Sequence, residues 1–133
     1  MISVLSEDSL PRLMIADEDP EIQALLDVSL SREFDVVGLA VDGEEAVRLA
    51  KVSQPDAALV DIAMLEGGGL RAVRRIHEVA PDTAIVVLSI DESGGAVREL
   101  MQAGAVVYLR KGVEPELLAE ALMDSIHSRR RAA

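Results

Sequence analysis

Short apolar runs alternate along the chain with longer segments in which apolar residues recur every three or four positions. The short runs are rich in β-branched and aliphatic residues, which favours strands. They occupy residues 12–16, 34–41, 57–61, 84–89 and 106–110. The longer segments have the spacing of amphipathic helices, as Leu70, Val73, Ile76 and Ala80 illustrate. The pattern therefore predicts five strands that alternate strictly with five helices.

Local signals agree with this alternation. Pro20 suits a first helical turn, Pro55 and Pro81 mark helix ends, and Gly104 can cap another helix. Parallel strands need crossover connections, which helices provide, and the nearly continuous apolar runs fit strands buried on both faces. The expected fold class is α/β, a five-stranded parallel sheet with helices on both faces.

The length of 133 residues corresponds to one domain, and 50% hydrophobic residues with only 2% aromatic ones predict a core of aliphatic side chains. Residues 1–11 show no periodicity, so we expect a flexible leader before a single domain over 12–128. The arginines in 129–133 either complement the dipole at a helix end or begin a linker.

Composition excludes several classes of function. The chain has no cysteine, so it has no disulfide, thiolate metal cluster or cysteine nucleophile, and a reducing compartment, the cytoplasm, is expected. No apolar run approaches the roughly 20 residues of a membrane helix, and the first residues lack a signal-peptide pattern, so we expect no membrane partner. The formal net charge of −11 repels phosphate backbones, which argues against direct nucleic-acid binding by this chain.

Acidic, hydroxyl and basic residues follow the predicted strands, where an open parallel sheet binds its ligands. They are Asp17, Glu18 and Asp19 after the first strand, Asp61 at the end of the third, Ser89 at the end of the fourth and Lys111 after the fifth. Carboxylates about 4 Å apart repel each other by roughly 4 kcal/mol at an effective dielectric of about 20, so such a group favours a bound cation. Oxygen ligands without nearby His or Cys point to Mg²⁺.

Asp61 closes an apolar strand, so its carboxylate must be exposed, paired or functional. A lysine and a metal offset the repulsion between a carboxylate nucleophile and an anionic donor, and a serine hydroxyl can donate to a phosphoryl oxygen. Asp61, Lys111 and Ser89 therefore suggest phosphoryl transfer onto a carboxylate.

Four segments carry a family resemblance: ADEDP from Ala16, QPDAALVDIAM from Gln54, VVLS from Val86 and AGAVVYLRK from Ala103. In order and spacing they resemble the receiver domain of two-component response regulators, from about Arg12 to the end of the last helix. The resemblance implies a flavodoxin-like (βα)5 fold with strand order 2-1-3-4-5.

The resemblance also implies roles for single residues. Asp61 would accept a phosphoryl group from a sensor histidine kinase, with Lys111 as the active-site lysine. Mg²⁺ would be held by Asp17, Glu18, Asp61 and the backbone carbonyl of Ala63; Ser89 and Tyr108 would form the switch; Ala63 and Asp91 would tune the lifetime of the phosphoryl group.

Two positions depart from the family pattern. The second member of the acidic pair is Glu18 instead of Asp, so either Glu18 or Asp19 is the direct metal ligand. After Met64, Leu65 and Glu66 precede the glycines at 67–69, for which we expect a mobile loop beside Asp61.

The resulting hypothesis is a phosphorylation-controlled signalling switch. Its output surface would comprise the fourth helix, fifth strand and fifth helix, about residues 95–126, and would bind an output domain or a second copy. The chain would catalyse only its own phosphorylation and slow autodephosphorylation.

Three alternatives stay open at this point. In the first, the acids and Lys111 form a purely structural ion cluster. In the second, the chain is a metal-assisted phosphatase, which Ala63 disfavours because such enzymes carry a second acid two residues beyond the nucleophile. In the third, the chain is a degenerate receiver that binds proteins without phosphorylation. His77 and His127 are expected to be surface or packing residues.

Overall fold

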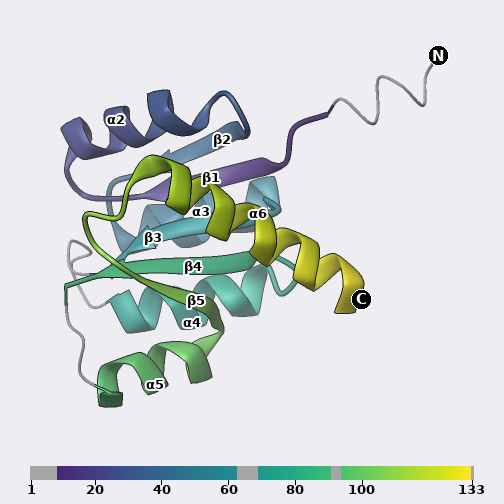
Figure 1. Cartoon of the computed structure of the whole chain (residues 1–133). Helices are drawn as coiled ribbons and strands as arrows, with labels where there is room; N and C mark the ends of the chain where they lie inside the picture. The colour runs from purple at the N-terminus through teal and green to yellow at the C-terminus, as the bar shows by residue number, and fades with distance from the viewer. Residues whose placement is uncertain (1–8, 63–68, 91–93, 133) are drawn as a thin grey trace.

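The computed structural model describes residues 9–62, 69–90 and 94–132 (Figure 1). The strands are β1 Arg12–Ala16, β2 Asp35–Ala40, β3 Ala57–Asp61, β4 Ala84–Ser89 and β5 Ala105–Arg110. The helices are α2 Pro20–Leu30, α3 Gly43–Ser53, α4 Gly69–Val79, α5 Gly94–Ala103 and α6 Pro115–Ala132. These elements alternate along the described chain as the apolar pattern predicts.

The strands form one parallel sheet in the order β2-β1-β3-β4-β5. Helices α3, α4 and α5 cover one face, and α2 and α6 cover the other (Figure 1). The predicted fold class, strand order and two helical layers are confirmed.

The central strands are buried on both faces because their side chains alternate between two cores. In β1, Met14 contributes to the core beneath α3, α4 and α5, whereas Leu13 and Ile15 contribute to the core beneath α2 and α6. Every residue of β3 and β4 is buried. This double burial explains why these runs are apolar without a polar alternation.

The ends of α2 have clear local causes. The side chain of Asp19 caps the helix by accepting a 2.9 Å hydrogen bond from the backbone N–H of Glu21, and Pro20 occupies the first turn, as predicted. After the helix, the N–H of Phe34 donates to the carbonyl of Leu30 at 2.9 Å. This bond ties Phe34 to the end of α2, so the second strand starts at Asp35, one residue later than expected.

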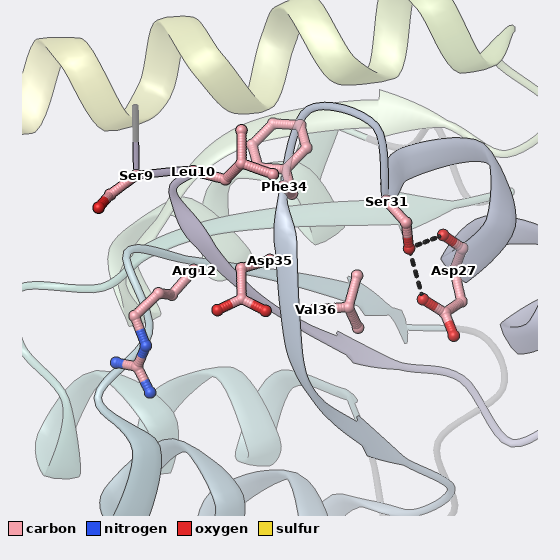
Figure 2. A pocket seen from close by; sticks show the side chains of 8 residues that line it. All are labelled: Ser9, Leu10, Arg12, Asp27, Ser31, Phe34, Asp35 and Val36. Atoms are coloured by element: carbon pink, nitrogen blue, oxygen red, sulfur yellow. Dashed lines mark hydrogen bonds between the residues drawn. The ribbon is translucent and has the colours of Figure 1, made fainter. Parts of the chain in front are cut away.

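The amino-terminal edge of the sheet lies opposite the edge where the acidic residues gather. Pro11 accepts a 2.8 Å hydrogen bond from the N–H of Asp35, while Ser9 and Leu10 are exposed. Figure 2 shows Ser9 and Leu10 beside Phe34 at the border of a hollow of about 580 Å³ at this edge. The rest of the expected leader, residues 1–8, lies outside the described residues.

Gly104 forms the turn between α5 and β5 and packs against α4. Its φ is +129°, and a Cβ atom placed on it would lie 2.6 Å from Cγ of His77. A residue with a side chain would therefore strain the backbone and collide with the imidazole ring. The half-buried His77 thus serves packing, whereas His127 is exposed.

We predict that Gly104→Ala lowers the free energy of unfolding by about 2 kcal/mol or more, because it adds backbone strain to a steric clash. Gly95→Ala is the matched control, since a Cβ there meets nothing within 4 Å. It should raise the free energy of unfolding by about 0.5 kcal/mol. Urea denaturation measures both, and equal stability of the two variants would contradict the packing described for Gly104.

Candidate functional site

Two carboxylates lie side by side at the carboxyl edge of the sheet. Asp17 follows β1 directly, Asp61 is the last residue of β3, and these strands are neighbours with Ala16 opposite Val60. The exposed fractions of the two acids are 0% and 1%. Because both acids lie at the ends of apolar strands, their carboxylates have almost no contact with water.

Lys111 supplies the positive charge of the site. Its Nζ lies 2.7 Å from Oδ2 of Asp61, and its side chain is 30% exposed. The backbone N–H of Lys111 donates to the carbonyl of Ser89 at 3.0 Å, which ties the residue after β5 to the end of β4. The hydrogen bond to Asp61 raises the pKa of Lys111, which keeps the ammonium charged at neutral pH.

Asp17 is held by its backbone and by one of its carboxylate oxygens. Its N–H donates to the carbonyl of Ala40 at 2.9 Å, and its Oδ1 accepts from the N–H of Asp19 at 2.9 Å. Its Oδ2 is buried and accepts no hydrogen bond from the described residues. Burial, with the negative charge of Asp61 as a further cause, raises the pKa of Asp17 from 3.8 to about 6.

At neutral pH the two carboxylates and Lys111 leave one negative charge uncompensated. Together with the unsatisfied Oδ2 of Asp17, this charge fits a hard divalent cation with oxygen ligands, so Asp17 and Asp61 suit Mg²⁺. Within the described ranges no group of three His, Cys, Asp or Glu residues converges. Further ligands would have to come from water, from a bound anion, from Glu18 or Asp19 after a change of rotamer, or from residues beyond these ranges.

Glu18 and Asp19 are the other acidic residues predicted as ligands. Glu18 is exposed, and Asp19 is half-buried with its Oδ1 occupied as the cap of α2. The structure therefore places neither with Asp17 and Asp61 in a three-acid group. Ala63, whose carbonyl the resemblance assigned to the metal, lies outside the described residues, as does Asp91.

The two predicted switch residues lie on neighbouring strands. Ser89 ends β4 and is 3% exposed. Tyr108 lies on β5 opposite Val87 and packs, half-buried, against the core beneath α3, α4 and α5. Ser89 thus lies at the same sheet edge as Asp61, and Tyr108 lies on β5, the next strand after β4 in the sheet.

Two features of the site were missed at the level of sequence. Gln23 is 7% exposed, and its Nε2 donates to the carbonyls of Ala40 at 2.8 Å and Asp17 at 3.4 Å. The available signal was a polar residue three positions before Leu26, on the apolar face of its helix.

The second feature concerns the glycine run. Gly69 is the buried first residue of α4, not part of a loop, and a Cβ atom there would lie 2.8 Å from Cα of Ile62. This close approach allows α4 to start against the residue that follows Asp61. Glu66, Gly67 and Gly68, the rest of the expected mobile loop, lie outside the described residues.

The family pattern of the response regulator receiver domain matches residues 13–123. The chain belongs to this family. It is 32% identical over 112 residues to the chemotaxis protein CheY of Thermotoga maritima, covering 84% of this chain and 93% of CheY. It is 34% identical over 113 residues to the transcriptional regulatory protein YxjL of Bacillus subtilis, and 41% identical over 54 residues to the transcriptional regulatory protein PrrA of Mycobacterium tuberculosis.

The matched segments cover 52% of YxjL and 23% of PrrA, so both regulators contain much that this chain does not match. Among solved structures, the receiver domain of the response regulator NarL from Mycobacterium tuberculosis superposes with a TM-score of 0.83 at 26% identity. That match covers 90% of this chain and 98% of the NarL domain. The receiver fold is therefore shared over almost the whole described chain.

We predict that Asp17→Asn stabilises the metal-free protein. Because the pKa of Asp17 is raised to about 6 from 3.8, the folded state binds the proton more tightly than the unfolded state, and ionisation of Asp17 destabilises the fold as the pH rises through about 6. An asparagine still accepts the Asp19 N–H bond but carries no charge. In buffer with a chelator, the free energy of unfolding at pH 8 should rise by about 2 kcal/mol, and the gain should shrink toward pH 5.

Asp42→Asn is the control for loss of one acidic charge, because Asp42 is the exposed cap of α3. It should not reproduce the gain. Denaturant titrations at several pH values measure the effect, and an Asp17→Asn variant less stable than the unmodified protein at pH 8 would contradict it.

Proposed function

We propose that the chain is a phosphorylation-controlled signalling switch in which Asp61 accepts a phosphoryl group from a sensor histidine kinase. The observation that carries this proposal is the buried Asp61 carboxylate held 2.7 Å from Lys111 and beside the ionisable Asp17. A purely structural ion cluster is disfavoured because these three groups do not balance their charges.

In the proposed transfer an Asp61 oxygen attacks the phosphorus of a phosphohistidine. The new P–O bond forms as the P–N bond breaks, and the imidazole nitrogen keeps the electron pair of the broken bond. Lys111 offsets the negative charge of Asp61 and of the incoming phosphoryl oxygens. The product is an acyl phosphate on Asp61.

Receiver domains generally bind Mg²⁺ at the phosphorylation site, and the residues present fit that ion. Asp17 and Asp61 would hold it, together with the Ala63 carbonyl and with Glu18 or Asp19. When bound, the ion neutralises phosphoryl oxygens that would otherwise repel the carboxylates.

The proposed response starts at Ser89, whose hydroxyl donates to a phosphoryl oxygen on Asp61. Tyr108 then turns inward, and the surface formed by α5, β5 and α6 changes its affinity for an output domain or a second copy. Two relatives are named transcriptional regulatory proteins, which supports an output in transcription. We expect only self-phosphorylation and slow autodephosphorylation, without turnover of a separate substrate.

The setting of the switch follows from charge and composition. None of the described helices is long and apolar enough to cross a membrane. The absence of cysteine favours a reducing cytoplasm, and the net charge of −11 argues against direct contact with nucleic acid. A nucleic-acid contact would therefore belong to a separate output domain.

We predict that a small phosphodonor with Mg²⁺ labels the protein once and that Asp61→Asn abolishes the label. Intact-mass spectrometry measures the label, and circular dichroism checks that the variant is folded. Asp82→Asn is the matched control, because it removes an exposed acid that precedes β4 at the opposite edge of the sheet, and it should label normally. Undiminished labelling of Asp61→Asn would refute the phosphoacceptor assignment.

The same experiment separates the remaining alternatives. A phosphorylated Asp61 that persists supports the switch, whereas continuous release of phosphate from the donor supports a phosphatase. Absence of labelling with Mg²⁺ present supports a degenerate receiver that binds proteins without phosphorylation.

A further prediction concerns Lys111→Ala, which removes the cation 2.7 Å from Asp61. We expect the labelling rate to fall by about tenfold or more, because the donor then meets an uncompensated pair of carboxylates. Thermal melts should show that the substitution lowers the stability of the protein less than it lowers the labelling rate. Lys51→Ala, a change at an exposed lysine of α3, should alter neither quantity. A Lys111→Ala variant that labels at the normal rate would contradict the role of the lysine.

A further inference from the structure

Gln23 is a buried polar residue that the proposed chemistry does not use. It lies on the inner side of α2, is 7% exposed, and directs its amide toward the loop after β1. Its Nε2 donates to the carbonyl of Ala40 at 2.8 Å and to the carbonyl of Asp17 at 3.4 Å. One side chain therefore bridges the end of β2 and the backbone of a site acid.

The same Ala40 carbonyl accepts the N–H of Asp17 at 2.9 Å. Asp17 is thus held at its N–H by Ala40, at its carbonyl by Gln23, and at its Oδ1 by the N–H of Asp19. These contacts together fix the direction of the remaining oxygen, Oδ2, which is buried and without a hydrogen bond from the described residues.

Burial and electrostatic repulsion both favour an outward movement of Asp17. Its charge is buried beside the carboxylate of Asp61, and an outward rotation of the loop would return it to water and relieve the repulsion. That rotation would break the bond from Gln23 to the Asp17 carbonyl and the bond from the Asp17 N–H to the Ala40 carbonyl, both of which lie in a buried environment. The amide therefore opposes the electrostatic force on the loop.

We propose that Gln23 is a positioning residue that holds the Asp17 carboxylate toward Asp61 and thereby sets the affinity of the site for Mg²⁺. This inference rests on the proposed function, since it assumes that Asp17 is a metal ligand. Mg²⁺ requires near-ideal octahedral geometry, so a displaced carboxylate lowers the affinity even when the fold persists. Gln23 would then act through Asp17, without touching the ion.

The test compares Gln23→Met, which keeps the length of the side chain and removes the amide, with Thr83→Val. Thr83 is 2% exposed, and its Oγ1 donates to the carbonyl of Pro55 at 2.7 Å at the opposite edge of the sheet. Gln23→Met loses two side-chain bonds to backbone carbonyls and Thr83→Val loses one, so a merely structural role predicts lower stability in both variants and no selective loss of Mg²⁺ affinity in Gln23→Met. Calorimetric titration with MgCl₂ measures affinity, and thermal melts measure stability.

We expect the dissociation constant for Mg²⁺ to rise about tenfold in Gln23→Met and to stay within about twofold in Thr83→Val, with similar falls in melting temperature. Gln23→Asn keeps the amide but shortens its reach, so it should lose affinity in the same way and serves if Gln23→Met does not fold. Unchanged affinity in the folded Gln23 variant, or an equal loss in Thr83→Val, would overturn the assignment.

The result also separates this inference from the proposed function. If the unmodified protein binds no Mg²⁺, the metal-dependent function fails and the role of Gln23 fails with it. If the unmodified protein and Gln23→Met bind Mg²⁺ equally well, only the role of Gln23 is wrong.

Discussion

The site depends on two buried carboxylates that share one lysine among the described residues. Asp17 and Asp61 are almost fully buried, and Lys111 neutralises only one of them. In a low-dielectric environment this excess charge costs folding free energy, as the raised pKa of Asp17 indicates. A bound divalent cation would remove this repulsion, which is why the excess charge suits the edge to the proposed Mg²⁺ site.

Such a cluster requires a scaffold that resists its repulsion. The strands that carry the two acids are neighbours in a sheet, and β3 is buried throughout. Asp61 therefore cannot move away from Asp17 without disturbing the strand pairing. The loop after β1 is the less constrained part, and it is held by Ala40 of the adjacent strand and by Gln23 from α2. The favourable packing of the two apolar cores thus offsets the unfavourable burial of the two neighbouring carboxylates.

The alternation of strands and helices and the position of the main acids were predictable from local periodicity, whereas the strand order came from the family resemblance. Strands buried on both faces appear as continuous apolar runs, and Asp61 interrupts such a run at its end. Gln23 was not predictable as a site residue, since its partners, Ala40 and Asp17, meet it only through the tertiary fold. Gly69 was assigned to a loop because its close approach to Ile62 leaves no trace in the sequence. Glu18 fits the family pattern by position but is exposed in the structure.

In the proposed switch, the pairing of β4 with β5 would connect the site to the output surface. Ser89 lies opposite Arg110 in the register of β4 and β5, and its carbonyl accepts the N–H of Lys111. A movement at Ser89 therefore changes a backbone bond of the residue that pairs with Asp61. Tyr108 lies two residues before Arg110 on the same strand, so it shares any displacement of β5. Because β5 is an edge strand paired only with β4 in the described sheet, it can shift without disturbing a further strand, and this freedom makes it suited to carry a local charge change toward α5 and α6.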